Sequence, residues 1–205
     1  SVLSGRFAEL EQRRLVRLVG EWLNVERLRN HFTVIATEDK RSIQVGGLTL
    51  NTRLDRVDEL EDGQHIVIDY KTSKQSIGTL LGERLDEPQL PLYLVMAEEH
   101  AVGVSFASLK RGQLGFSAIV KDADLLPGVK AFSDTIGCKH FVSWEELIAT
   151  WRYYLTDLAE GFASGDARVD PKKYPITCTQ CELQSFCRVH ERIGSVPANQ
   201  ESENE

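Results

Sequence analysis

The chain has 205 residues, of which 41% are hydrophobic and 27% are charged, and its net charge at pH 7 is −7. A chain of about 200 residues can bury roughly 70% of its unfolded surface, which is enough for one well-formed core. The acidic balance argues against nonspecific coating of nucleic acid, and since we see neither a secretory signal nor an apolar run of membrane-spanning length, we expect a cytoplasmic protein that contacts no membrane.

The N-terminal part of the chain predicts one or two helices followed by strands. Apolar residues recur at helical spacing, among them Phe7, Leu10, Leu15, Leu18 and Trp22. The segments FTVIATE and SIQVG and the stretch from Leu48 to Leu60 alternate or are β-branched, which is typical of strands. The segment HIVIDYKT continues this series as a further strand.

A hairpin joins the last two of these strands, and its turn sets the register. Glu61–Gly63 fits a three-residue loop closed by a left-handed residue, a conformation that glycine adopts most easily. This loop places Asp55 opposite Asp69. A two-residue turn would instead bring Asp58 to the Asp69 face, because a shift of one residue exchanges the two faces of a strand. The residues alone favour Asp55 only modestly.

The second strand of this hairpin combines a carboxylate with an amine. Side chains alternate along a strand, so Asp69 and Lys71 share one face while Tyr70 lies on the other. Two carboxylates at the end of a hairpin suit Mg²⁺ or Mn²⁺, which take oxygen ligands and keep part of their water shell. Lys71 would then orient an attacking water or neutralise charge that develops on a phosphate. The alternative is a surface hairpin with a weak ion pair.

The next helix is predicted to begin at Asp86–Pro88, since proline is favoured in the first turn and acids before it. Gln89 and Tyr93 are one turn apart on one face. An amide and a phenol near a helix N-terminus can hold a phosphate, helped by free backbone N–H groups. The alternative places Tyr93 on the apolar face of the helix.

The following segments predict two strands and a long helix. Residues 102–110 and 113–120 form strands around a turn at Arg111–Gly112. Ser143 and Glu146 form a capping box at the start of a helix that ends near 161–165. We expect its aromatic residues to pack in the core.

The C-terminal segment 176–190 contains Cys178, Cys181 and Cys187, a spacing compact enough to surround one metal centre. A reducing compartment disfavours disulfides, so a metal site is preferred. Zinc could be completed by His190, whereas an iron-sulfur cluster would normally need a fourth cysteine. The spacing does not choose between them. Residues 1–193 are expected to form a single domain, and residues 194–205 a disordered tail.

Three consecutive motifs, RLDRVD, VIDYKT and EPQLPLY, resemble those of RecB-type nuclease domains in the PD-(D/E)XK superfamily, which includes AddB-like repair exonucleases. The resemblance implies a restriction-endonuclease-like α/β core, a central mixed sheet flanked by helices, with a C-terminal cysteine-rich segment. It also implies metal ligation by Asp55, Asp69 and the main-chain carbonyl of Tyr70, with Lys71 as the catalytic amine. Gln89 and Tyr93 would line the DNA path.

The same resemblance implies a [4Fe-4S] cluster held by the three C-terminal cysteines and one far upstream. The only other cysteine here, Cys138, follows the nuclease core, and no histidine precedes His31, although the family carries a metal-binding histidine before the core. We therefore expect the chain to be the C-terminal part of a longer protein. The acids Glu9, Glu11 and Glu21 are possible substitutes for the missing ligand.

These patterns together predict a metal-dependent DNA nuclease, an exonuclease of DNA repair or recombination that works with a helicase in the same chain or in a partner subunit. Arg56 and Arg84 are predicted to contact DNA, within a basic groove that also includes Arg53, Lys71, Lys74, Lys110 and Arg111. The alternatives are a DNA-binding module without cleavage and a structural fragment stabilised by a cysteine metal site.

Overall fold

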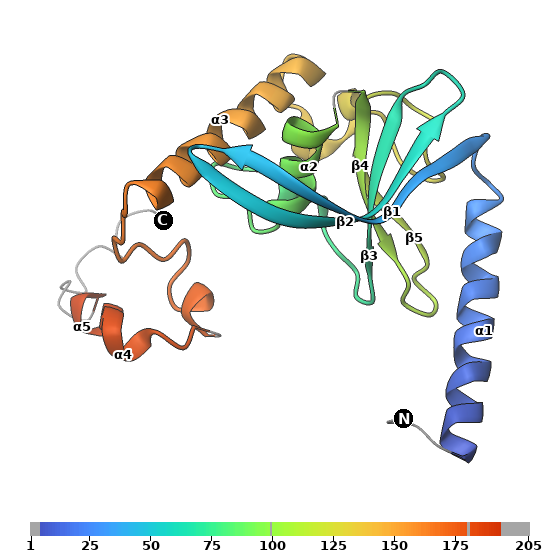
Figure 1. The fold of residues 1–205 in the computed structure, drawn as a ribbon, viewed down its shortest axis with the longest axis horizontal. Coiled ribbons are helices and arrows are strands. Elements are labelled where there is room, and N and C mark those ends of the chain that lie inside the picture. The colour runs from blue at the N-terminus through green and yellow to red at the C-terminus, as the bar shows by residue number, and fades with distance from the viewer. Residues whose placement is uncertain (1–4, 99, 180, 194–205) are drawn as a thin grey trace, which may run out of the picture. The chain divides into compact units, whose positions relative to one another are not determined.

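The computed structural model describes residues 5–98, 100–179 and 181–193. The main elements, in chain order, are α1 (Arg6–Glu26), β1 (Phe32–Val45), β2 (Leu48–Leu60), β3 (His65–Lys71), α2 (Gln89–Ala97), β4 (Ala101–Ser108), β5 (Gly115–Val120), α3 (Trp144–Ala163), α4 (Gln184–Cys187) and α5 (Val189–Ile193) (Figure 1). None of the described helices combines the length and the apolarity needed to cross a membrane.

The five strands form one mixed sheet in the order β1-β2-β3-β4-β5. β3 and β4 are parallel and are joined through α2, whereas the other neighbouring strands are antiparallel. A parallel pair needs a crossover connection, and α2 provides it. The predicted α/β architecture with a central mixed sheet is confirmed.

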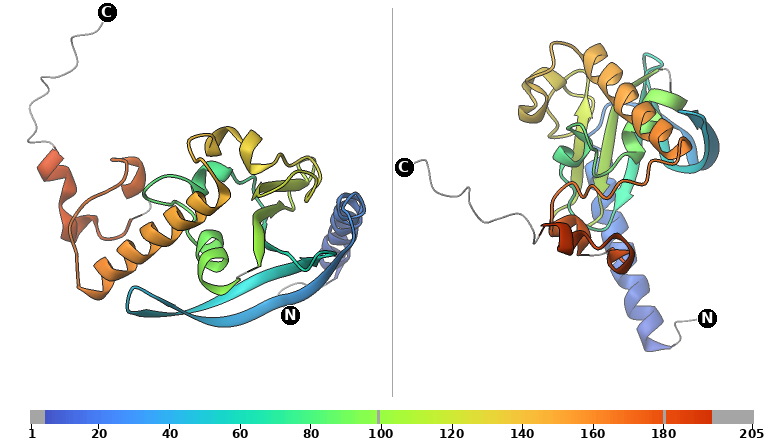
Figure 2. Two further views of the ribbon diagram at one scale, coloured as in Figure 1. Left: turned by 90° about the horizontal axis from the view of Figure 1, so that it is seen from above. Right: turned by 90° about the vertical axis from the view of Figure 1, so that its left-hand side faces the viewer.

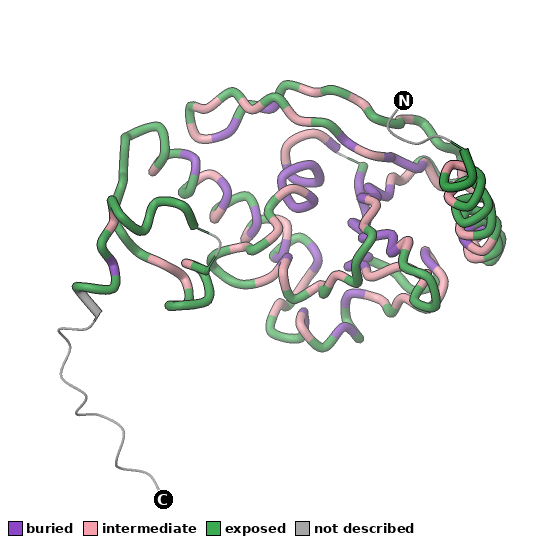
Figure 3. The backbone as a smooth tube through the Cα atoms, turned by 90° about the horizontal axis from the view of Figure 1, so that it is seen from below, coloured by how far each residue is buried: buried purple, intermediate pink, exposed green. Residues whose placement is uncertain are grey.

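Helices cover both faces of this sheet. α2 and α3 pack on one face, where Val67, Val104 and Phe106 join a core that includes Trp151. α1 lies on the other face, where its Trp22 packs with Ile66 and Ile68 of β3 (Figure 2). Figure 3 shows α2 largely buried, whereas most of α1 is exposed. Each face of β3 therefore belongs to a different core.

The hairpin between β2 and β3 has the predicted three-residue loop. Leu60 N donates to the Gln64 carbonyl at 2.8 Å, and Gly63 has a φ of 78°. Arg56 pairs with Ile68 and Val57 with Val67, so the next pair in this register is Asp55 with Asp69. Turn geometry thus places Asp55, not Asp58, on the Asp69 face, as predicted.

The β1–β2 ribbon is longer than its sequence pattern indicates. FTVIATE and SIQVG form one continuous strand with an irregularity between Val34 and Ala36. At the end of the ribbon, Gly46 has a φ of 51° and lies so close to α3 that an added Cβ would stand 2.6 Å from the Cβ of Ala159. Glycine is required here both by the backbone conformation and by the contact.

The chain divides into two compact units, Ser1–Ser164 and Gly165–Glu205. The single domain expected over residues 1–193 stays a prediction. The cysteine segment forms its own short helices and local hydrogen bonds. The predicted disordered tail, residues 194–205, lies outside the described residues.

Candidate active site

Asp55 and Asp69 lie on the face of the sheet that α2 covers, just beyond the last recorded pair between β2 and β3, Arg56 with Ile68. Asp55 accepts a hydrogen bond through Oδ2 from the backbone N–H of Tyr70, at 2.9 Å. This bond ties the side chain on β2 to the backbone of β3, directly beside Asp69. The alternation of two strands in a fixed register is enough to bring the two carboxylates together.

Lys71 projects from the same face as Asp69, and its Nζ lies 3.0 Å from Asp69 Oδ2. Burial raises the pKa of Asp69; the ion pair with Lys71 lowers it, and the charges of Asp55 and Glu87 raise it, with a net increase. Burial acts to lower the pKa of Lys71, but the three acids Asp69, Glu87 and Asp55 outweigh burial and raise it. Lys71 is therefore a cation at neutral pH in the metal-free protein.

Two residues that the sequence patterns did not assign to the site also lie beside it. Glu87, just before α2, is close enough to change the pKa of both Asp69 and Lys71, although its position before a proline indicates only a helix start. Ser108 of β4 pairs with Lys71 in the parallel register and is buried, and its Oγ has no hydrogen-bond partner in the described part of the chain. The sequence did not predict the position of Ser108, because a small polar residue at the end of a strand does not by itself indicate a site.

The predicted pair Gln89 and Tyr93 does come together on α2. Gln89 Nε2 donates to the Tyr93 hydroxyl at 3.0 Å, and this hydroxyl donates to the carbonyl of Arg53 at 2.6 Å. Tyr93 is only 2% exposed and belongs to the core. The hydrogen bond from the Tyr93 hydroxyl to Arg53 attaches α2 to β2 near Asp55. Tyr93 is therefore placed to support the site and not to line an open DNA path. Gln89 is half-buried and stays a candidate contact.

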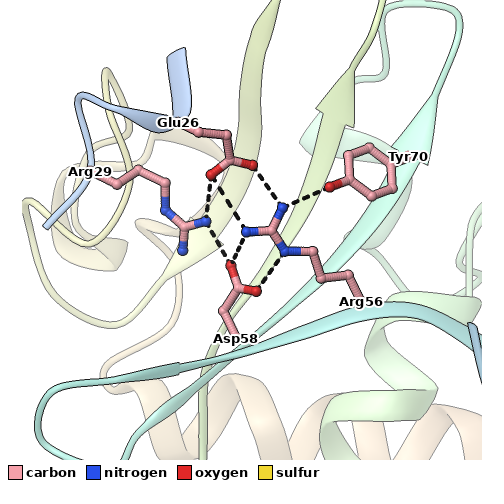
Figure 4. A network of polar contacts seen from close by, with 5 residues as sticks. All are labelled: Glu26, Arg29, Arg56, Asp58 and Tyr70. Carbon is pink, nitrogen blue, oxygen red and sulfur yellow. Dashed lines mark hydrogen bonds and ion pairs between the residues drawn. The ribbon is translucent and has the colours of Figure 1, made fainter. Parts of the chain in front are cut away.

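A buried ionic network occupies the opposite face of the same two strands (Figure 4). Arg56 directly follows Asp55, and it donates to Asp58 at 2.6 and 2.9 Å, to Glu26 of α1 at 2.8 Å, and to the Tyr70 hydroxyl at 2.7 Å. Tyr70 in turn directly follows Asp69. Burial acts to lower the pKa of Arg56, but its bonds to Asp58 and Tyr70 raise it overall. The predicted DNA contact by Arg56 is therefore corrected, because its guanidinium is buried and occupied by protein groups.

Arg29 completes this network from the segment after α1. Its Nη1 lies 2.6 Å from Asp58 and 2.9 Å from Glu26, while its guanidinium stands 3.8 Å above the ring of Phe32. Nε and Nη2 of Arg29 are buried without a hydrogen-bond partner among the described residues, so the ring supplies their main favourable contact. The two arginines balance the charges of Glu26 and Asp58, and the network connects α1 to β2 on the face opposite Asp55.

Comparison with known proteins identifies the family. A model described as the PD-(D/E)XK nuclease superfamily matches residues 3–188. The chain belongs to this superfamily. Its sheet and helices form the restriction-endonuclease-like α/β fold, and members of the PD-(D/E)XK superfamily are in general metal-dependent nucleases.

Among solved structures, one titled "Crystal structure of SSO0001" matches with 16% sequence identity and a TM-score of 0.36, and the match covers 89% of this chain and 74% of that chain. No curated protein matches the chain significantly.

The carboxylates of Asp55 and Asp69 fit a divalent cation. Asp69 Oδ2 is buried and has no hydrogen bond within the described ranges, so the contact with Lys71 is an ion pair without hydrogen-bond geometry. Among the described residues, Asp55 accepts a hydrogen bond through Oδ2. An unsatisfied buried carboxylate oxygen is unfavourable unless a further group binds it, and a hard cation is such a group. Over the residues that the structure describes, no three His, Cys, Asp or Glu side chains gather closely enough to hold a metal by themselves, so water or main-chain oxygen would be needed as well.

The other predicted site residues are spread more widely. Arg84 is exposed, and Arg53 forms an exposed ion pair with Glu38. The acids of α1 cannot reach the carboxylates, since α1 packs on the opposite face of the sheet through Trp22. Glu11, for example, pairs with Arg14 on the exposed part of α1.

The four cysteines are free thiols. Cys178 and Cys187 are half-buried and Cys181 is exposed, all within the second unit. Cys138 is 1% exposed in the core of the first unit, and burial raises its pKa to about 11. A thiol in this environment resists the ionisation that metal ligation requires, so Cys138 is a poor fourth ligand.

Proposed function

We propose that this chain is a divalent-metal-dependent DNA nuclease, with Asp55 and Asp69 as metal ligands and Lys71 as the catalytic cation. The observation that supports this most directly is the placement of the three side chains on one face, with Lys71 Nζ 3.0 Å from Asp69 Oδ2 and Asp55 fixed to the backbone between them. Membership of the PD-(D/E)XK superfamily supports the same chemistry.

Each residue has a distinct task in phosphodiester hydrolysis. A bound Mg²⁺ or Mn²⁺ would supply Lewis acidity, which polarises the phosphate and lowers the pKa of a ligated water. Asp55 and Asp69, with the main-chain carbonyl of Tyr70 as the resemblance implies, would hold that ion. Lys71 stays protonated, so it donates hydrogen bonds to the water or to a phosphate oxygen and neutralises the charge that develops as the new P–O bond forms and the leaving oxygen departs.

Metal removal tests this proposal. End-labelled linear DNA, incubated with the protein, should be degraded in Mn²⁺ or Mg²⁺ and left intact in EDTA, and excess Mn²⁺ should restore cleavage. Ca²⁺, which is larger and takes more ligands, should support binding with little cleavage. Cleavage that persists in EDTA, or none in either catalytic metal, would contradict the proposal.

We further propose that the nuclease is a RecB-type exonuclease of DNA repair or recombination, working with a helicase region or subunit. The support is the order and the residues of the motifs RLDRVD, VIDYKT and EPQLPLY. An exonuclease should degrade linear DNA and spare covalently closed circles of the same sequence. Equal cleavage of both forms would indicate an endonuclease instead.

The three C-terminal thiols are proposed as ligands of a [4Fe-4S] cluster, with zinc and His190 as the alternative. Their support is the spacing of the three cysteines in one short segment of sequence, since among the described residues these side chains do not gather into a metal-binding group. Anaerobically purified protein should be brown, absorb near 400 nm and contain iron and sulfide, and Cys181→Ser should lose the colour while Cys138→Ser keeps it. A colourless protein with one equivalent of zinc would support the alternative, and neither metal after reconstitution would contradict both.

A further inference from the structure

A cleft of about 340 Å³ lies between the first half of α1 and the turn that joins β4 to β5. One wall consists of α1 residues about one helical turn apart, and Arg111 of the turn forms the other. This half of α1 continues beyond the strands (Figure 1), while the buried residues of the helix, Trp22 and Glu26, lie near its C-terminal end. The cleft is therefore on the α1 side of the sheet, away from the face that carries Asp55 and Asp69.

Packing beside the cleft holds its two walls together. Trp22 of α1 contacts Phe116 of β5 edge to face, with the ring centroids 5.1 Å apart. The turn before β5 is tight, since Gln113 N donates to the Lys110 carbonyl at 2.9 Å. Arg111 is thus placed against α1 by a short, hydrogen-bonded turn and not by a long loop.

The lining of the cleft is rich in arginine and contains Arg13, Arg14, Arg17 and Arg111. Arg14 is paired with Glu11 at 2.6 Å. Arg13, Arg17 and Arg111 make no hydrogen bond or ion pair with any residue that the structure describes. Because a guanidinium stays protonated in proteins, three positive charges face one small space in a chain whose overall charge is −7.

Phosphate is the anion that best fits this arrangement. A guanidinium donates in a planar fork to two oxygens of one phosphate, and arginine is for this reason favoured where phosphate is recognised. Arg13 and Arg17 are one turn apart on one helix face, at about 5–6 Å between Cβ atoms, and Arg111 faces them from the turn. A carboxylate, with two oxygens and one charge, would satisfy fewer of these donors. Leu10 and Leu18 add an apolar surface suited to sugar carbons.

We propose that this cleft is a second binding site, separate from the carboxylates, for the phosphate groups of a nucleic-acid strand or of a free nucleotide. Arg13, Arg17 and Arg111 would bind the phosphates. Glu21, the acidic residue in the lining, leaves the cleft with an excess of positive charge. The inference does not depend on catalysis at the carboxylates, and two measurements in EDTA distinguish the two sources of phosphate.

Thermal unfolding measures the binding of free phosphates. At constant ionic strength, chloride is replaced by inorganic phosphate or by thymidine 5′-monophosphate. A ligand that binds the folded protein should raise its Tm, by about 4 °C at ten times the Kd. Phosphate also stabilises proteins in general, so the readout is the difference between the unchanged protein and Arg17→Ala or Arg111→Ala, which should lose the specific part of the rise.

Fluorescence anisotropy of a labelled single-stranded DNA measures the binding of a strand. Arg17→Ala and Arg111→Ala should each weaken binding about tenfold and reduce the slope of log affinity against log salt by about 0.7, as expected for one lost phosphate contact. Arg17→Lys keeps the charge but not the planar fork, so it should keep the slope and lose part of the affinity.

Arg27 supplies a matched control. It is an exposed arginine at the C-terminal end of α1, and it does not line the cleft. Arg27→Ala should change neither the Tm response nor the affinity for the strand. Circular dichroism of every variant checks that the surface substitutions leave the fold intact.

The outcomes separate this proposal from the nuclease. A loss of strand affinity alone identifies a nucleic-acid backbone as the ligand, and a loss of the Tm response alone identifies a free phosphate or nucleotide. No loss in either measurement, or an equal loss in Arg27→Ala, overturns the cleft. Cleavage in Mn²⁺ is judged separately: a protein that cleaves DNA but shows neither loss leaves the nuclease in place, and one that shows a loss but never cleaves supports the cleft and rejects the nuclease.

Discussion

Lys71→Ala should lower the rate of metal-dependent cleavage by about 10²–10³-fold, the usual cost of removing one group that stabilises transition-state charge. Affinity for DNA should change little, because one contact among many phosphate contacts is lost. Single-turnover cleavage of end-labelled DNA in Mn²⁺, with affinity measured separately in EDTA, distinguishes the two effects. Lys139→Ala, which removes an exposed amine elsewhere, is the control. Equal cleavage by Lys71→Ala and the unchanged protein would reject the catalytic assignment.

Asp69→Asn should abolish cleavage and yet stabilise the metal-free protein. The pKa of Asp69 is raised in the folded state, so the folded protein binds a proton at this carboxyl more tightly than the unfolded chain does. The free energy of unfolding therefore falls as pH rises from the usual value of 3.8 through the higher folded pKa, and it stays lower at neutral pH. The neutral amide removes this penalty, and thermal unfolding in EDTA at pH 7 should show a higher Tm. A lower Tm would contradict the raised pKa.

Asp58→Ala should destabilise the protein by about 3–5 kcal/mol, as is typical when one partner of a buried ion pair is removed. Asp58 is fully buried and accepts hydrogen bonds from both Arg29 and Arg56, so its loss leaves two buried cations that only Glu26 can balance. Urea unfolding of this variant and of Asp122→Ala, which removes an exposed acid, gives the comparison. Tyr70→Phe removes a single hydroxyl from the same network and should cost only about 0.5–1.5 kcal/mol. Similar, small changes in all three variants would show that the network contributes little.

The part of the site that depends on local geometry could be predicted from the sequence. Gly63 favoured a three-residue loop, and strand alternation in the register of that loop brings Asp55, Asp69 and Lys71 together, although the residues alone favoured Asp55 over Asp58 only modestly. The mixed sheet was implied by the resemblance to the nuclease family, and the structure agrees with it. The hairpin needs only a few neighbouring residues, and there too the structure agrees with the sequence.

The features that depend on distant contacts could not be predicted in this way. Glu26 and Arg29 look like solvated charges at a helix end, and only the packing of α1 reveals that they are partners of Arg56. Strand alternation puts Arg56 on the face opposite Asp55, but alternation does not tell whether that face is buried or open to DNA. Tyr93 was ambiguous for the same reason, since helical spacing cannot tell a core face from a binding face. The contribution of Glu87 to the raised pKa of Lys71 could not be predicted either, because Glu87 comes from a separate segment of the chain.

The ionic network on the back of the sheet also makes the two faces mechanically dependent on each other. Asp55 and Arg56 share a peptide unit, as do Asp69 and Tyr70, and Arg56 is bonded both to Tyr70 and to Glu26 of α1. We therefore expect a displacement of either carboxylate to strain a bond to α1, and fraying of the last turn of α1 to loosen both carboxylates. Backbone amides near Glu26 should consequently exchange with deuterium more slowly when a divalent ion occupies the opposite face, which makes a helix remote from the chemistry a reporter of metal binding.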